Sequence, residues 1–150
     1  MNSNDTPPSP PSTPRLMNGS VRPSGVSWVA DDEAIDATFV LLLRALEGQD
    51  LGAVACAWKE LEAILVTHLD DEEQRVTPRI AAIQLRQALA ILQEHRFLRG
   101  RLRELGKAID GGRPCLVDAR SFRDELRAHA RHEADILRAL PDEVASLARR

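Results

Sequence analysis

The chain has 150 residues and a mass of 16.6 kDa, which is enough for one domain with a sizeable core. Aromatic residues make up 3% and Tyr is absent, which argues against a β-sandwich or β-barrel, and 20 basic against 23 acidic residues leave no basic excess for nucleic-acid binding. The longest apolar run, Ala53 to Trp58, has six residues, far fewer than the roughly 20 that span a bilayer. We therefore expect an all-α protein that binds neither nucleic acid nor a membrane.

The first 28 residues differ in composition from the rest. Six of the nine prolines fall between Pro7 and Pro23, among Ser and Asn residues and with few large apolar side chains. Such a segment buries too little apolar surface to offset the entropy lost on ordering. We therefore expect a disordered Pro/Ser-rich tail over residues 1–28 and a folded domain over 29–150.

Cysteine usage indicates a reducing compartment. Cys56 and Cys115 stand far apart in the sequence and form no C-x-x-C pair. We expect both thiols to be buried as small apolar groups. The N-terminal stretch also lacks the charged-then-apolar pattern of a secretory signal. A cytoplasmic location follows as the expectation.

Helical periodicity begins near Asp32 and continues to Pro141. Asp31 or Asp32 is suited to cap the first helix, Gly48 stands where a helix commonly ends, and Asp118 is suited to cap the last helix. Four helices with short connections predict an up-down-up-down four-helix bundle. The helices are expected over 32–47, from 51 onward, over 85–109, and from about 118 to 140, followed by a short amphipathic segment over 142–150.

Each predicted helix has an apolar face that ionisable residues interrupt. A polar group in a bundle core costs several kcal/mol unless it is paired, so six such groups in register indicate that they face one another. Carboxylates and imidazoles that meet inside a bundle are typical ligands of a di-metal site. The six residues are Asp36, His68, Glu72, His95, His129 and Glu133.

Two His–Glu pairs carry most of this signal. His68 with Glu72 and His129 with Glu133 are each four residues apart, so each pair lies on one face of its helix. Either pair alone would also fit a solvated helix face, but the two pairs together with His95 favour metal binding. His132 lies off the apolar face and is expected at the rim, outside the ligand set.

The position of one turn decides whether a site can form. If the second helix ended at Thr77, Glu72 and His95 would differ in height by roughly 18 Å, at about 1.5 Å per residue. Thr77-Pro78 does resemble a helix start. If the chain instead continues past Pro78 with a kink and turns near 82–84, both residues lie roughly eleven positions from the turn. We expect the second arrangement.

Three ordered motifs resemble the hemerythrin-like, or HHE, family. The segment 68–73 (HLDDEE) resembles that family's H-F-x-x-E-E motif, and 94–98 (EHRFL) resembles its E-H-x-x-L motif. His129 followed by Glu133 resembles the final H-x-x-x-E motif. The resemblance covers roughly residues 32–141.

The resemblance implies a site of two non-haem irons that binds or senses O2, nitric oxide or iron. Carried over motif by motif, Glu72 and Glu133 would bridge the irons, and the terminal ligands would be His68, His95 and His129. Asp36 stands where the family has a histidine, and Ile91 stands where some members have another. Three histidines in place of five argue against reversible O2 carriage, so we expect sensing or binding without turnover of an organic substrate.

Two other functions also fit the sequence. A carboxylate-rich di-iron site could instead act as an oxidase or peroxidase. A bundle that has lost its metal could serve as an interaction module, with the Pro-rich tail as its contact arm. Iron content separates the last function from the others, and catalytic peroxide consumption identifies the enzyme.

Overall fold

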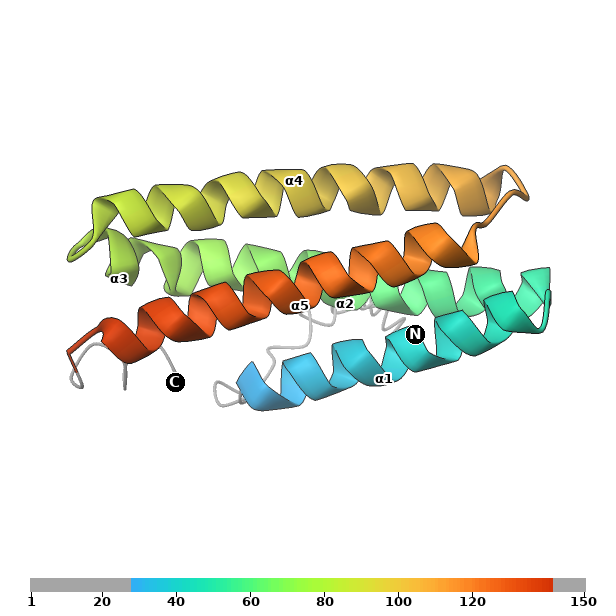
Figure 1. The fold of residues 1–150 in the computed structure, drawn as a ribbon, viewed down its shortest axis with the longest axis horizontal. Coiled ribbons are helices and arrows are strands. Elements are labelled where there is room, and N and C mark those ends of the chain that lie inside the picture. Colours follow the sequence, from blue (N-terminus) through green and yellow to red (C-terminus); the bar gives the residue numbers. More distant parts are fainter. Residues whose placement is uncertain (1–27, 142–150) are drawn as a thin grey trace, which may run out of the picture.

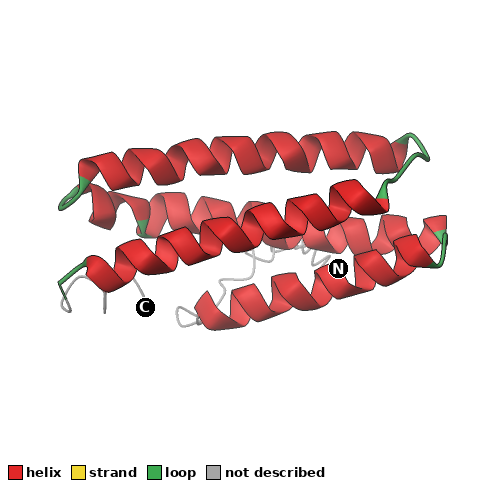
Figure 2. Cartoon of the chain, viewed as in Figure 1, coloured by secondary structure: helices red, strands yellow, loops and turns green. Residues whose placement is uncertain are grey.

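The computed structural model describes residues 28–141, and it folds as the up-down-up-down bundle that the sequence predicts. Four long helices run antiparallel to their neighbours in chain order, and a short helix follows the second (Figures 1 and 2). No strand occurs within the described residues. The expected disordered tail over 1–28 lies outside this range except for Trp28, which begins α1. The expected segment over 142–150 also lies outside it. The helices are α1 (Trp28–Glu47), α2 (Leu51–Arg75), α3 (Thr77–Ala81), α4 (Leu85–Asp110) and α5 (Leu116–Ala139).

The long helices begin at or before their predicted starts. α1 starts at Trp28, four residues before Asp32, and α5 starts at Leu116, so Asp118 lies in its first turn and does not cap it. An acidic residue in the first turn still favours the helix through the dipole. Asp50 caps α2, because its carboxylate accepts a 2.9 Å hydrogen bond from the backbone N–H of Ala53.

The chain turns at residues 82–84, as the metal geometry required. α2 ends at Arg75, and the N–H of the capping residue Val76 still donates to the carbonyl of Glu72 at 2.9 Å. α3 then carries the chain on to Ala81, with Pro78 in its first turn, where a missing N–H costs no helical hydrogen bond. The expected kink is thus a break between two helices. The turn at 82–84 brings α4 back beside α2, with Glu72 level with His95.

A polar layer divides the apolar core into two clusters. The larger cluster fills the end of the bundle where α1 and α2 join and includes Phe39 and Phe122, whose rings meet edge to face at 5.9 Å. The smaller cluster lies toward α3. Each of α2, α4 and α5 passes from one cluster to the other through the polar layer. The flanking buried residues are Leu69 and Val76 on α2, Leu98 and Ile91 on α4, and Leu126 and Ile136 on α5.

Two sequence expectations about burial need correction. The inward face of α1 is set by Ile35, Phe39 and Leu42, all buried, so Asp36 lies at the flank of that face and is only half-buried. The sequence placed Asp36 on an inward face with Phe39 and Leu43; Phe39 belongs to both faces, whereas Asp36 and Leu43 each lie about 100° around the helix from Ile35 and Leu42. The cysteines are not fully buried either, because Cys56 is exposed and Cys115 is half-buried. None of the described helices is long and apolar enough to cross a membrane.

Candidate metal centre

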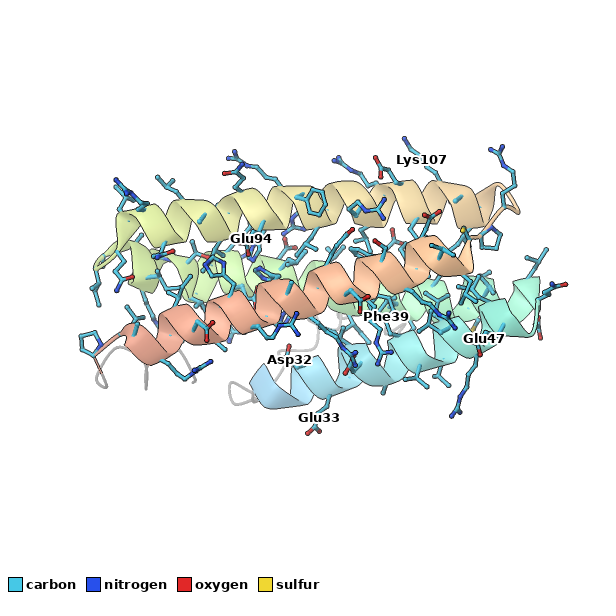
Figure 3. All side chains as sticks on the ribbon, viewed as in Figure 1. Asp32, Glu33, Phe39, Glu47, Glu94 and Lys107 are labelled. Carbon is cyan, nitrogen blue, oxygen red and sulfur yellow. The ribbon has the colours of Figure 1, made fainter. Side chains whose placement is uncertain are left out.

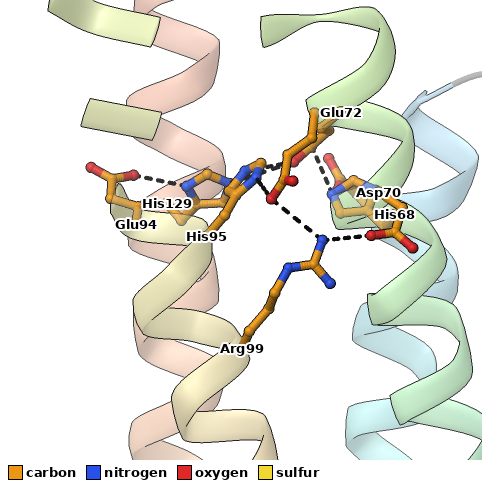
Figure 4. Close-up of polar contacts among 9 residues, drawn as sticks. His68, Asp70, Glu72, Glu94, His95, Arg99 and His129 are labelled. Atoms are coloured by element: carbon orange, nitrogen blue, oxygen red, sulfur yellow. Dashed lines mark hydrogen bonds and ion pairs between the residues drawn. The ribbon is translucent and has the colours of Figure 1, made fainter. Parts of the chain in front are cut away.

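Three buried side chains from three helices converge in the polar layer. Glu72 of α2, His95 of α4 and His129 of α5 are 1%, 0% and 6% exposed. One ligand atom from each lies within 4.8 Å of the other two. The two imidazole Nε2 atoms are 3.2 Å apart, and they lie 3.1 Å and 3.6 Å from Oε2 of Glu72 (Figure 4).

Carboxylates on the outer side orient both imidazoles. Nδ1 of His95 lies 3.1 Å from Oε1 of Glu73, and Nδ1 of His129 lies 2.8 Å from Oε2 of Glu94. A carboxylate accepts a hydrogen bond, so each Nδ1 carries a proton and each Nε2 points to the centre, where it can bind a cation once it has no proton of its own. Ligating histidines in metal sites are commonly held by carboxylates in this way.

The two orienting carboxylates are themselves held. Arg99 donates to Oδ1 of Asp70 at 2.7 Å and to Oε1 of Glu73 at 3.3 Å (Figure 4). Nδ1 of His132 lies 2.7 Å from the second oxygen of Glu94. Sequence reasoning assigned no role to Glu73 or Glu94. Both stand in the quoted motifs beside predicted site residues, but their positions next to the apolar face become informative only once the helices are packed.

His68 approaches Glu72 from the opposite side. Its Nε2 lies 2.9 Å from Oε1 of Glu72, whereas the other two imidazoles face Oε2. Asp32 of α1 adds a carboxylate oxygen 3.9 Å from Nε2 of His68. A single carboxylate therefore presents its two oxygens to separate groups of imidazoles.

Glu133 lies against Glu72 in the same layer. Burial raises the pKa of Glu133 to about 9, and the charge of Glu72 adds to that effect. Burial also opposes ionisation of Glu72, but the three surrounding imidazoles outweigh it and hold the pKa of Glu72 well below its ordinary value. Near neutral pH the pair therefore carries one charge and one proton.

The structure does not bring Asp36 to this cluster. Its side chain is 48% exposed, and its two oxygens pair with Arg123 at 3.3 Å and Arg127 at 2.9 Å. The hydrogen bond from Arg127, with the further contribution of Arg123, lowers the pKa of Asp36. The acid of α1 that approaches the centre is Asp32, one turn earlier. His132 is half-exposed at the rim, as expected.

The residues in the layer fit a metal ion. Both oxygens of Glu72 are buried and accept no hydrogen bond of ordinary geometry, although imidazole nitrogens lie close to them. The two inner Nε2 atoms lie 3.2 Å apart beside Oε2 of Glu72, so a cation bound here could take all three atoms as ligands. A set of imidazoles and carboxylates suits iron and related transition metals.

Comparison with protein families agrees with this geometry. The model of the hemerythrin HHE cation binding domain matches residues 27–140. The chain belongs to this family. Searches of curated protein sequences and of solved structures found no significant match.

The matched range of this HHE domain contains the entire polar layer and all five described helices. The family resemblance and the bundle predicted from sequence are therefore both confirmed. The cluster of Glu72, His95 and His129 gives the domain a candidate metal site.

Proposed function

We propose that this HHE domain binds two non-haem irons and senses O2, nitric oxide or iron, without carrying O2. The observation that supports it best is the orientation of His95 and His129. Their outer nitrogens are held by Glu73 and Glu94, which directs both Nε2 atoms toward Glu72 in a buried layer. Two imidazoles and a carboxylate that are held toward one point form a ready set of ligands for a cation.

The proposed ligands divide between two ions that share Glu72. One ion would be held by His95, His129 and Glu72, and the other by His68 and Glu72. Glu133, which lies against Glu72, is the second proposed bridge, and Asp32 is placed to complete the side of His68. Bound iron supplies a redox-active centre to which O2 or nitric oxide can bind.

The ligand set supports sensing over carriage. The second proposed position has one histidine, and the remaining nearby donors are carboxylates. Oxygen-rich sets favour harder, more oxidised iron, which does not bind O2 reversibly. Free cysteines, one of them exposed, support a reducing, cytoplasmic location for the domain.

The test is metal analysis of anaerobically purified protein, followed by optical spectra after addition of nitric oxide or O2. We expect about two irons per chain, as in carboxylate-bridged bundles, and a spectral change with either gas. Protein that takes up no iron under these conditions would contradict the proposal and favour the interaction module.

The carboxylate-rich surroundings of His68 favour one second candidate, a di-iron oxidase or peroxidase. The same loaded protein distinguishes it. Catalytic consumption of peroxide over many turnovers would establish the enzyme, whereas a single stoichiometric response supports the sensor.

A further inference from the structure

A cavity of about 420 Å³ lies between α1 and α5. Its polar lining includes two histidines of the metal centre, His68 and His129. In Figure 3, Asp32 points from α1 toward α5 across this region, whereas Glu33 points away. The volume falls within the range of about 300–1,000 Å³ that small-molecule sites occupy. The apolar part of the lining is Ile35, Phe39, Leu126 and Ala130.

The α5 side of the cavity carries a row of arginines. Arg123, Arg127 and Arg131 follow one another at four-residue spacing, so they lie on one face of the helix. The α1 side supplies two acids, Asp32 and Asp36. Three positive charges against two negative charges leave the lining with an excess of positive charge.

The arginines already hold a carboxylate, that of Asp36. Its Oδ1 lies 3.3 Å from Nε of Arg123, and its Oδ2 lies 2.9 Å from Nη2 of Arg127. Each oxygen therefore has its own guanidinium, which is the arrangement that recognises a carboxylate by geometry as well as by charge. Because Asp36 is 48% exposed, it can turn into water, and exposed ion pairs of this kind contribute little to stability.

We propose that this cavity binds a small organic carboxylate, which displaces Asp36 from Arg123 and Arg127 and buries its short apolar body against the apolar lining. The apolar lining favours an organic acid over an inorganic anion, since a hydrated ion gains nothing from burial against hydrocarbon. Asp36 then acts as a tethered competitor that keeps the arginines neutralised until the ligand arrives. The bound molecule lies beside His68 and His129.

Calorimetric titration of the full chain tests this, with hexanoate, hexan-1-ol and inorganic phosphate as probes. Metal-free and iron-loaded protein are both titrated, so that failure of iron binding leaves the test intact. Hexanoate is expected to bind in both forms, about tenfold more tightly than hexan-1-ol, which lacks the charge-assisted hydrogen bonds. Absent hexanoate binding would overturn the proposal, and so would equal binding of hexan-1-ol or of phosphate.

Three variants assign the binding to this cavity. Arg127→Gln should weaken hexanoate about tenfold, because one of the two guanidiniums is lost. Asp36→Asn should tighten it about threefold, because the tethered competitor no longer carries a charge. Arg120→Gln is the matched control, since Arg120 lies on the same helix but pairs with Glu47 away from the cavity.

The two directions of change protect the test against misfolding. Unfolding could explain weaker binding in Arg127→Gln, but it could not explain tighter binding in Asp36→Asn. Circular dichroism of each variant verifies helicity. Arg127→Gln and Asp36→Asn proteins that both bind hexanoate as the wild type does would overturn the assignment.

Discussion

The Nε2 atoms of His95 and His129 lie 3.2 Å apart in the middle of the bundle, and each ring is held from outside by a carboxylate of the preceding long helix. Glu73 of α2 holds the imidazole of α4, and Glu94 of α4 holds that of α5. α2 and α4 thus each contribute to the centre and also orient an imidazole of the next long helix. Loss of one orienting carboxylate should loosen a ligand without removing it.

The first prediction concerns Glu94. Glu94→Gln should lower iron affinity by about 10–100-fold, the usual effect of removing a carboxylate that orients a ligating histidine. Competition with a calibrated chelator measures the affinity. Glu104→Gln is the matched control, since Glu104 is an exposed residue of the same helix that pairs with Arg101. Equal affinities in the two variants would contradict the orienting role.

The second prediction separates the two acids of α1. Asp32→Ala should weaken iron binding, because the Asp32 carboxylate lies 3.9 Å from Nε2 of His68. Asp36→Ala should leave iron content unchanged, because Asp36 pairs with Arg123 and Arg127. Iron analysis of both variants measures the difference. Iron loss in Asp36→Ala with none in Asp32→Ala would restore the ligand role that the sequence suggested for Asp36.

The third prediction concerns the stability of the metal-free protein. Glu133 keeps its proton up to about pH 9 when folded but releases it near its ordinary pKa of 4.5 when unfolded. Its contribution to folding is therefore fully present below pH 4.5 and is lost progressively as the pH rises to about 9. In Glu133→Gln this loss is absent, so Tm should fall less between about pH 5 and about pH 8 than in the wild type. Parallel Tm curves would show that Glu133 ionises normally.

The fourth prediction concerns the proton that Glu133 carries in the metal-free protein. A bridging carboxylate is ionised, so iron binding near pH 7 should release the proton of Glu133. Calorimetric titration in buffers of different ionisation enthalpy counts the released protons. The count should be about one lower in Glu133→Gln than in the wild type. An unchanged count would exclude Glu133 as a ligand.

Most of the layer could be predicted from the sequence, because the positions of His68, Glu72 and His95 depend on helix periodicity and on one turn. The apolar faces of α2, α4 and α5 are long, so an ionisable residue on any of them is placed within a fraction of a turn. The turn at 82–84 followed from the requirement that facing ligands share a height.

The face of α1 was predicted less well. Asp36, Phe39 and Leu43 match an inward face almost as well as Ile35, Phe39 and Leu42 do. Phe39 belongs to both faces, and a modest rotation of the helix decides between them. The arginines at positions 123 and 127 of α5 decide between the two, since they attract Asp36 to the flank. Long-range ion pairs of this kind leave no periodic trace in the sequence. The contacts of Glu73 and Glu94 could not be predicted either, because both residues lie beside the apolar faces and outside their periodic pattern.

The central claim is that the buried layer binds iron, and anaerobic iron titration of His95→Ala beside His132→Ala tests it most directly. His95 is fully buried among the converging atoms, whereas His132 is half-exposed and reaches the centre only through Glu94. The account predicts about two irons per chain in the wild type. It predicts loss of most iron in His95→Ala, and retained stoichiometry with a smaller loss of affinity in His132→Ala. Equal iron content in the two variants would contradict it.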